Sequence, residues 1–327
     1  MSHSKTPLAV ILTGLGLTFT AAAPASAAPN EPTGPIERKY DAGGPAGVRH
    51  MTSAAACDRK GNPCDIWYPS DIGRGPPRAV LLWANGTSDG PVGKEVYEHI
   101  LSHFASWGFV VIATRDGKTG YGDTVLDSLA YLRKFAEQPA SPLHRRVDFA
   151  RVGVAGHSQG ATGAANAMLK SRGTIKTTIA FQLPAQLWCS PADLCLLTPD
   201  LEAAKSGSIF YVGGTLDALI SPDWQFSSGP LNSLTAYYKA TPSKLPKAKG
   251  LVKLANHNDI LGKPDCRSAA QSVTLTCTFG VYGYRGFPTA WLAWQLQGSK
   301  EAGKAFRHKE GEFFTAKAWH SQLSNVQ

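Results

Sequence analysis

Charged residues are scarce in this sequence, and no long hydrophobic run follows its first thirty positions. Of the 327 residues, 17% are charged and 43% are hydrophobic, a balance that excludes a disordered chain and allows a large core. No stretch after residue 30 approaches the roughly 18 apolar residues that a membrane-spanning helix needs. Internal repeats and long linkers are also absent, so we expect one domain over residues 28–327.

Motifs typical of metal sites and nucleic-acid sites are absent as well. No C-x-x-C occurs, and because Glu98 comes before His99, the pair His99 and His103 is not part of an H-E-x-x-H motif. We expect these two histidines to lie on a helix surface without a metal, and we expect no organic cofactor. The net charge of +9 is not concentrated in a basic patch, which indicates solubility and not nucleic-acid binding.

The start of the chain has the three parts of a secretory signal peptide. Lys5 precedes a short apolar run over residues 8–20, and an Ala-x-Ala sequence ends at Ala27. The run is too short to span a bilayer comfortably. We therefore predict a signal peptide over residues 1–27 and a secreted, extracellular protein that does not insert stably into a membrane.

The cysteines are even in number and fall into three close pairs along the chain. Because disulfides form in exported proteins, the predicted export favours three bridges over metal ligation. The simplest pairing joins sequence neighbours, although other connectivities remain open. The predicted pairs are Cys57 with Cys64, Cys189 with Cys195, and Cys266 with Cys277.

Continuous hydrophobic runs alternate with segments of helical spacing along most of the chain. The predicted strands cover residues 65–69, 78–84, 109–113, 152–155, 175–183, 208–212 and 251–254. The predicted helices cover residues 94–107, 123–135, 161–169, 231–239 and 288–297. This alternation is typical of an α/β fold, in which helices cover both faces of a mostly parallel sheet. Residues 29–47 are rich in proline and glycine and are predicted to be irregular.

A G-x-S-x-G motif, Gly156-His157-Ser158-Gln159-Gly160, lies between a predicted strand and a predicted helix. In this context the motif is typical of a nucleophile elbow, where the glycines leave room that bulky side chains would fill. We therefore predict that Ser158 is a catalytic nucleophile. We expect the neighbouring His157 to be a packing or substrate-binding residue.

A serine nucleophile of this kind needs a histidine later in the chain to accept its proton. The candidates are His257, His308 and His320. His257 comes just after the predicted strand 251–254, whereas the other two lie in a charged tail. We predict that His257 is the general base.

An acidic residue should orient the histidine, and it should also follow a strand. Asp217 comes after the glycines that end the predicted strand 208–212. Asp223 lies deeper in the same loop, and Asp259 is so close to His257 in sequence that a local turn contact is expected for it. Asp217 is the predicted acid, with the other two as alternatives.

Two backbone N–H groups should form an oxyanion hole for the reacting carbonyl oxygen. One belongs to the residue after the nucleophile, Gln159. The other should come from the loop after the predicted strand 78–84. Thr87 is the predicted donor in that loop, and Gly86 and Ser88 are the alternatives.

With Ser158, Asp217 and His257 in this order, the sequence resembles the α/β-hydrolase family. Within it, the chain is similar to secreted bacterial cutinases and polyester hydrolases and to dienelactone-hydrolase-like esterases. The motifs that carry the resemblance, besides the triad residues and the elbow, are Trp67-Tyr68-Pro69, Asn85-Gly86-Thr87 and Thr289-Ala290-Trp291-Leu292. The resemblance implies an α/β-hydrolase fold and a substrate-facing role for Trp188. It also shows that Thr87 stands where these cutinases carry an aromatic residue.

Together these residues predict a secreted serine hydrolase that cleaves carboxylic esters through an acyl-enzyme and needs no cofactor. No long lid insertion separates Ser158 from His257, which favours an open site and short-chain or polymeric esters. The same triad would also serve an acyltransferase, a lipase or a peptidase, and a non-catalytic surface-binding relative is a third hypothesis. We expect the protein to be a monomer.

Overall fold

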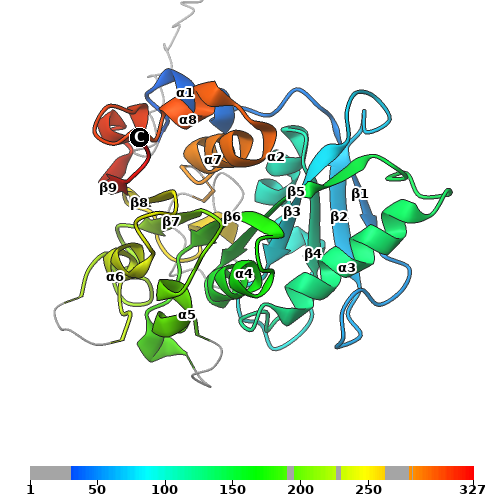
Figure 1. Ribbon diagram of the computed structural model, residues 1–327, viewed down its shortest axis with the longest axis horizontal. Helices are drawn as coiled ribbons and strands as arrows, with labels where there is room; N and C mark the ends of the chain where they lie inside the picture. Colours follow the sequence, from blue (N-terminus) through cyan, green and yellow to red (C-terminus); the bar gives the residue numbers. More distant parts are fainter. Residues whose placement is uncertain (1–30, 190–194, 226–229, 262–279, 282) are drawn as a thin grey trace, which may run out of the picture.

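A mixed β-sheet lies at the centre of the protein, with helices on both sides (Figure 1). The structure is a computed structural model that describes residues 31–189, 195–225, 230–261, 280–281 and 283–327. The predicted signal peptide, residues 1–27, and the predicted bridge between Cys266 and Cys277 lie outside these residues.

Within the described residues the sheet has nine strands, in the order β1-β2-β4-β3-β5-β6-β7-β8-β9. All strands from β3 to β8 are parallel to one another, whereas β1, β2 and β9 join antiparallel at the two edges. The strands are β1 (Val48–Thr52), β2 (Cys64–Pro69), β3 (Arg78–Ala84), β4 (Val110–Thr114), β5 (Val147–His157), β6 (Ile175–Phe181), β7 (Ile209–Gly214), β8 (Lys247–Val252) and β9 (Trp319–Ser324). The predicted mostly parallel α/β fold is confirmed.

The helices form two layers, one on each face of the sheet (Figure 1). One layer holds α1 (Pro35–Asp41), α2 (Glu98–Ser106), α7 (Gly286–Gln297) and α8 (Lys300–Lys304). The other holds α3 (Asp123–Glu137), α4 (Gln159–Lys170), α5 (Thr198–Glu202) and α6 (Leu234–Ala240). Short 3-10 turns are η1 (Lys94–Val96), η2 (Gln186–Trp188), η4 (Asp259–Leu261) and η6 (Glu312–Thr315). Among the described residues, every helix is too short or too polar to cross a bilayer.

Strand β3 shows why a continuous hydrophobic run suits the middle of this sheet. Alternate side chains of a strand point to opposite faces. Leu81 and Trp83 pack in the core beneath α2 and α7, whereas Val80 and Leu82 pack in the core beneath α3 and α4. Both faces of the strand are therefore buried from Ala79 to Ala84, and a polar side chain at any of these positions would replace a core contact.

Residues 29–47 are more regular than the sequence predicts, because α1 forms within them. The N-terminus of α1 has no capping side chain of its own, and the distant Glu312 takes that place. Its carboxylate accepts hydrogen bonds of 2.8 Å from the N–H groups of Ile36 and Glu37. A carboxylate at a helix N-terminus satisfies unpaired N–H groups and complements the helix dipole. Sequence spacing cannot show a cap supplied from so far along the chain.

The charged segment that carries His308 and His320 has regular structure, which its sequence does not predict. This segment forms α8, η6 and β9, and β9 pairs antiparallel with β8 at the edge of the sheet. His320 lies in β9, and His308 Nδ1 donates to the carbonyl oxygen of Ser324, 2.7 Å away. Pairing with an existing sheet edge, which the local sequence does not reveal, gives this polar segment its structure.

Two of the three predicted disulfides lie in the described residues, and both are present. Cys57 is bonded to Cys64 at the start of β2, and Cys189 is bonded to Cys195 after η2. The prediction that sequence neighbours pair is confirmed for these four cysteines. The bonded cysteines are 7 and 6 residues apart in sequence, and cross-linking such short loops contributes roughly 2–3 kcal/mol in the chain-entropy model.

Candidate active site

Ser158 lies at a sharp turn between β5 and α4, with φ of 56° and ψ of −130°. Positive φ is strained for a residue other than glycine. The flanking glycines explain how the turn is possible. A Cβ on Gly156 would lie 2.1 Å from the carbonyl oxygen of Gly160, and a Cβ on Gly160 would lie 2.1 Å from that of Ala84. The elbow therefore requires glycine at both positions and holds Ser158 at the end of a central strand.

Ser158, His257 and Asp217 form one continuous chain of hydrogen bonds. His257 Nε2 is 2.9 Å from Ser158 Oγ, and His257 Nδ1 is 2.6 Å from Asp217 Oδ2. Asp217 is 3% exposed and His257 is 6% exposed, so solvent does not compete for these contacts. Asp217 Oδ1 also accepts a hydrogen bond of 3.3 Å from the N–H of Ser221. The carboxylate is thereby held with one oxygen toward the imidazole.

Sheet topology brings these three residues together. Ser158 follows β5, Asp217 follows β7 and His257 follows β8, and these strands are parallel and near one another in the sheet. The carboxyl ends of parallel strands lie at one edge, where ligands bind in open α/β sheets. The structure places the predicted nucleophile, acid and base at this edge, in contact.

The two alternative acids have other partners. Asp223 pairs with the buried ammonium group of Lys249. Asp259 accepts hydrogen bonds from the backbone N–H groups of Asn256 and Gly280. Asp259 is thus a local turn acceptor, as its position in the sequence suggests, and neither carboxylate is hydrogen-bonded to the His257 ring among the described contacts.

The backbone N–H groups in the loop after β3 differ in whether they have an acceptor within the protein. The N–H of Gly86 donates to Tyr97 Oη at 3.0 Å, and the N–H of Ser88 donates to the carbonyl oxygen of Gly117 at 2.8 Å. Within the described part of the chain, the N–H of Thr87 has no such partner. Gln159 begins α4, where the first N–H groups of a helix lack intrahelical acceptors. Thr87 and Gln159 are therefore the donors best placed for an oxyanion.

A small pocket of about 180 Å³ lies over Ser158. Its lining residues are Thr87, Ser158, Gln159, Thr162, Pro184, Trp188, Cys189 and Ile220. Trp188 is 47% exposed, and its indole N–H donates to the carbonyl oxygen of Leu219 at 2.8 Å, which fixes the ring as one wall. The disulfide to Cys195 holds the chain directly after this ring.

Ser158 thus lies at a strained turn beside a small pocket, and part of the chain is similar to a known family. Residues 41–190 match the PETase family, described as PET hydrolase-like. The matched segment contains the oxyanion loop, the elbow and Trp188, so the predicted resemblance to polyester hydrolases of the α/β-hydrolase fold is confirmed. Asp217 and His257 lie beyond it. No curated protein gives a significant match to the chain.

In this PET hydrolase-like segment, His157 does not line the pocket. Its ring is 2% exposed and lies behind Ser158, with Nδ1 3.0 Å from Tyr97 Oη and Nε2 2.9 Å from the carbonyl oxygen of His257. Both ring nitrogens are therefore used within the protein. Of the two predicted roles, the structure favours packing over substrate binding.

Most of the exposed large hydrophobic side chains among the described residues lie in three segments at the carboxyl ends of the strands. A contiguous patch of exposed hydrophobic side chains is typical of a binding surface. They come from the segments after β6, β7 and β8, which also carry Pro184, Trp188 and Ile220 of the pocket and the triad residues Asp217 and His257. We call them the apolar rim: Leu187, Trp188, Leu216, Leu219, Trp224 and Leu254.

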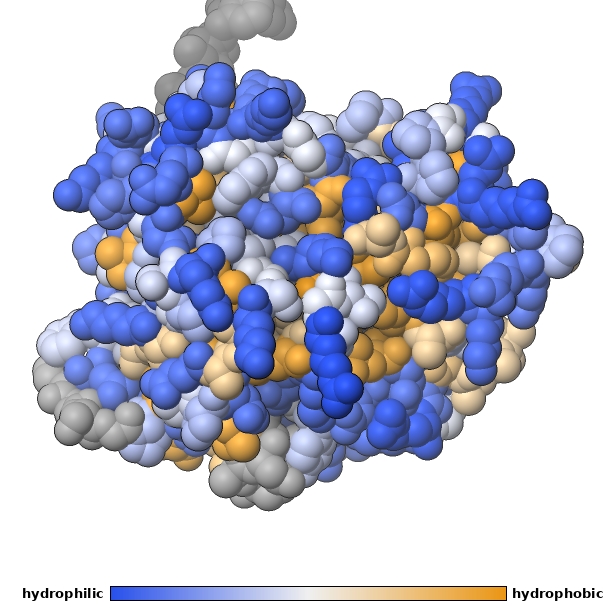
Figure 2. Space-filling view, viewed as in Figure 1, coloured by the Kyte–Doolittle hydropathy of each residue, from blue (hydrophilic) through white to orange (hydrophobic). Residues whose placement is uncertain are grey.

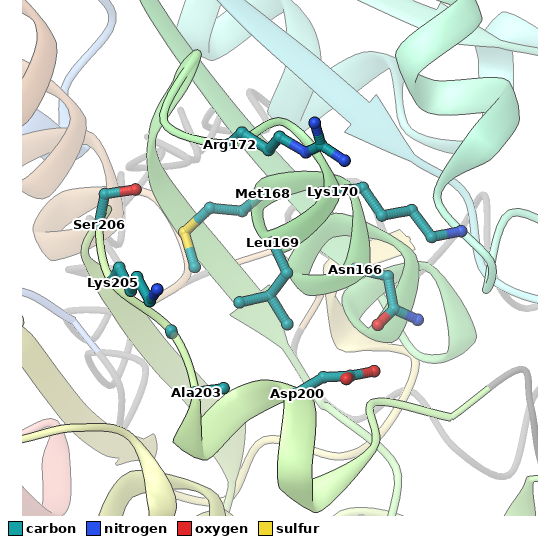
Figure 3. A pocket seen from close by; sticks show the side chains of 10 residues that line it. Asn166, Met168, Leu169, Lys170, Arg172, Asp200, Ala203, Lys205 and Ser206 are labelled. Atoms are coloured by element: carbon teal, nitrogen blue, oxygen red, sulfur yellow. The ribbon is translucent and has the colours of Figure 1, made fainter.

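A larger cavity, about 480 Å³, lies between α4 and α5 and holds none of the triad side chains (Figure 3). Lys170, Arg172 and Lys205 surround apolar atoms of Met168 and Leu169 there. Figure 2 shows hydrophilic and hydrophobic side chains next to one another over these two helices. Lys170 is already paired with Asp123 at 2.9 Å, so the charge of this cavity is partly neutralised.

The expectation that His99 and His103 share a helix surface is wrong for His103. His103 is buried, and its Nε2 lies 2.9 Å from the carbonyl oxygen of Tyr40 and 3.1 Å from Thr289 Oγ1. Burial lowers its pKa to about 3, so the ring is neutral. Among the described residues, no three His, Cys, Asp or Glu side chains gather as a metal site.

Sequence reasoning missed several residues of the site. Thr162, Pro184 and Ile220 line the pocket, and Tyr97 lies beneath the oxyanion loop. Pro184 is at a strand end, which is a weak signal for such a position. The others carry no sequence signal, because only the packing of separate loops places them near Ser158.

Proposed function

We propose that the protein is a secreted serine hydrolase that cleaves carboxylic esters with Ser158, His257 and Asp217 as its catalytic triad. The observation that carries this proposal is the chain of contacts of 2.9 Å and 2.6 Å from Ser158 Oγ through His257 to Asp217 at a strained elbow. The match to PET hydrolase-like proteins supports an ester as the substrate. The predicted signal peptide and the two disulfides support export.

In the first half of the reaction, Ser158 Oγ attacks the ester carbonyl carbon while His257 Nε2 takes the hydroxyl proton. The carbonyl oxygen becomes an oxyanion, which the N–H groups of Thr87 and Gln159 stabilise. The C–O bond to the alcohol then breaks, and His257 passes its proton to the leaving oxygen. Asp217 holds the imidazole tautomer and stabilises the imidazolium.

In the second half, water replaces the alcohol. The oxygen of the water molecule attacks the acyl carbon while His257 takes a proton from that water. The bond between the acyl carbon and Ser158 Oγ then breaks, and His257 returns the proton to Ser158 Oγ. The products are a carboxylic acid and the free enzyme. No metal or cofactor takes part in these steps.

The pocket and the apolar rim support short-chain or polymeric esters as substrates. A pocket of about 180 Å³ holds only a small acyl or aryl group. The rim extends the apolar surface beyond it, so a long or insoluble ester can lie across the rim with one ester group at Ser158.

The test is the Ser158→Ala variant, assayed with p-nitrophenyl esters of increasing chain length and with a polyester film. We expect kcat to fall by roughly 10⁶-fold while the fold is kept, since the nucleophile alone is removed. The matched control is Ser171→Ala, which removes a serine hydroxyl at the other end of α4. A fluorophosphonate probe should label the wild type and the control but not Ser158→Ala.

Retained ester cleavage in Ser158→Ala would contradict the proposal. Product analysis with an added alcohol separates hydrolysis from acyl transfer. Probe labelling without turnover of any ester would instead favour a different acyl substrate.

A further inference from the structure

A chain of hydrogen bonds behind Ser158 connects the oxyanion loop to the backbone of the general base. The N–H of Gly86 donates to Tyr97 Oη at 3.0 Å, and Tyr97 Oη lies 3.0 Å from His157 Nδ1. His157 Nε2 lies 2.9 Å from the carbonyl oxygen of His257. Tyr97 is 4% exposed and His157 is 2% exposed, so no solvent interrupts the chain.

Only one arrangement of protons satisfies every contact for a neutral ring. The carbonyl oxygen of His257 can only accept, so His157 Nε2 must carry a hydrogen. His157 Nδ1 is then an acceptor, and the hydroxyl group of Tyr97 donates a hydrogen bond to it. The phenol oxygen in turn accepts from the N–H of Gly86. All donors and acceptors are used, which is the condition for a stable buried polar network.

His157 must stay neutral for this arrangement. Burial, together with the neighbouring His257, lowers the pKa of His157 well below its usual value. The two rings are 5.0 Å apart. A charged His157 would oppose the positive charge that His257 acquires in the proposed reaction, so a neutral ring is also the chemically useful one.

At one end, the chain helps to hold the backbone on the N-terminal side of Thr87. Asn85 is buried, and its side-chain amide donates to the carbonyl oxygens of Thr114 at 2.6 Å and Asp116 at 3.1 Å. Tyr97 holds the next N–H, that of Gly86. A Cβ on Gly86 would lie 3.0 Å from Tyr97 Oη, so glycine permits this close approach.

At the other end, the chain holds the backbone of His257. The N–H of His257 donates to Asn256 Oδ1 at 2.9 Å, and its carbonyl oxygen accepts from His157. The imidazole is held separately by Asp217 and Ser158. His157 is also the residue before Ser158, so the backbones of base and nucleophile are tied to one side chain.

We propose that Tyr97 and His157 are positioning residues. They hold the backbone next to Thr87 and the backbone of His257, and thereby fix the positions of the Thr87 N–H group and the His257 imidazole relative to Ser158. This inference rests on the proposed ester hydrolysis. Neither residue lines the pocket, so their effect is on the rate of the chemical step and not on substrate binding.

The first test compares Tyr97→Phe with Tyr211→Phe. Tyr211 is also fully buried, and its hydroxyl is bonded to Thr241 Oγ1 at 2.7 Å, so both variants lose one buried hydroxyl contact. We expect Tyr97→Phe to lower kcat by about tenfold to a hundredfold with little change in KM, because small misplacements of reacting groups have effects of this size. Tyr211→Phe should keep the wild-type kcat.

Equal kcat values for the two variants, measured on samples that are folded by thermal melting, would overturn the proposal. So would a change in KM alone. If Tyr97→Phe does not fold, His157→Gln and His157→Leu replace it in the comparison. Glutamine keeps a donor toward His257, so its kcat should exceed that of the leucine variant, and equal values would overturn the proposal.

A second test does not depend on activity. Ring-nitrogen NMR shifts of His157 at neutral pH should show the neutral tautomer with hydrogen on Nε2, and Tyr97→Phe should shift the Nδ1 resonance. Hydrogen on Nδ1, or a charged ring, would overturn the proposal. If the wild type cleaves no ester, the proposed function fails, and these shifts still decide whether the hydrogen-bond chain exists.

Discussion

The two sides of Ser158 are built in different ways. On the oxyanion side, buried polar side chains such as Asn85, Tyr97 and His157 hold the backbone through hydrogen bonds. On the side that carries Trp188, the apolar rim exposes side chains such as Trp188 and Leu219. The first side has little freedom to adapt, since each broken contact would leave a buried polar group unsatisfied. The second can change its shape and composition at small cost.

This contrast divides the proposed work of the site. Groups that stabilise charge in a transition state must be held in place before the reaction. A surface that receives apolar substrates needs area and not exact geometry. Changes on the buried side should therefore alter kcat, and changes on the rim should alter binding.

Beyond the loss of Ser158 itself, the largest effect is expected from the buried carboxylate of Asp217, in Asp217→Asn. Asparagine cannot stabilise the imidazolium or select the productive tautomer, so kcat should fall by roughly 10⁴-fold in p-nitrophenyl ester assays. The control is Asp223→Asn, which disturbs the contact with Lys249 in the same loop. Its kcat should stay near the wild-type value. A similar loss of kcat in both variants would contradict the role of Asp217 as the acid that orients His257.

A buried acid outside the site, Glu37, should affect the stability of the fold and not the reaction. Glu37 is fully buried, with one oxygen bonded to the indole N–H of Trp319 at 2.6 Å and the other without a partner among the described residues. Burial raises its pKa from 4.5 to about 7. Between these values the unfolded state binds fewer protons than the folded state, so stability falls as pH rises through this window.

Glu37→Gln should remove this loss, because glutamine keeps an acceptor for Trp319 and has no charge. Denaturant unfolding should show a gain over the wild type of about 3 kcal/mol above pH 7 that shrinks toward pH 4.5. Glu301→Gln, which changes an exposed acid paired with Lys39, is the control and should have a small effect. Parallel pH curves for wild type and Glu37→Gln would contradict the prediction.

The smallest effect is expected on the rim, from Trp188→Ala. Adsorption to a polyester film should weaken severalfold and KM for bulky esters should rise severalfold. Either change corresponds to a loss on the order of 1 kcal/mol, because apolar contact area is lost. Turnover of p-nitrophenyl acetate should change little. Leu197→Ala, an exposed leucine outside the pocket, is the control. A large fall in kcat for the small ester would show that Trp188 belongs with the buried side.

Most strands and helices could be predicted from local pattern. β3 was predicted at its observed bounds, because a strand buried on both faces must be continuously hydrophobic. α1 and β9 could not be predicted, since each is stabilised by a distant partner, Glu312 for α1 and β8 for β9. Neither partner leaves a mark on the local sequence.

The residues of the site also fall into those that the sequence predicts and those that it does not. The elbow glycines, Asp217 and His257 have sequence signals, since steric need and strand ends dictate residue type and position. His157 and Trp188 were both predicted near the substrate, yet one is 2% exposed and the other 47% exposed. Sequence neighbours of a catalytic residue can point to either side of the chain, and only the packing around them decides which.

By itself, the sequence determined the alternation of strands and helices and the order of Ser158, Asp217 and His257, the predicted nucleophile, acid and base. It favoured the pairing of neighbouring cysteines, which two disulfides confirm. These features depend on neighbouring residues and on hydrophobic periodicity. Tertiary structure alone decided which donor in the oxyanion loop is free, which acid reaches His257, and that Tyr97 and His157 join the two ends of the site. Such contacts join residues far apart in the chain, and a hydrogen bond depends on where its partners lie and not on where they occur in sequence.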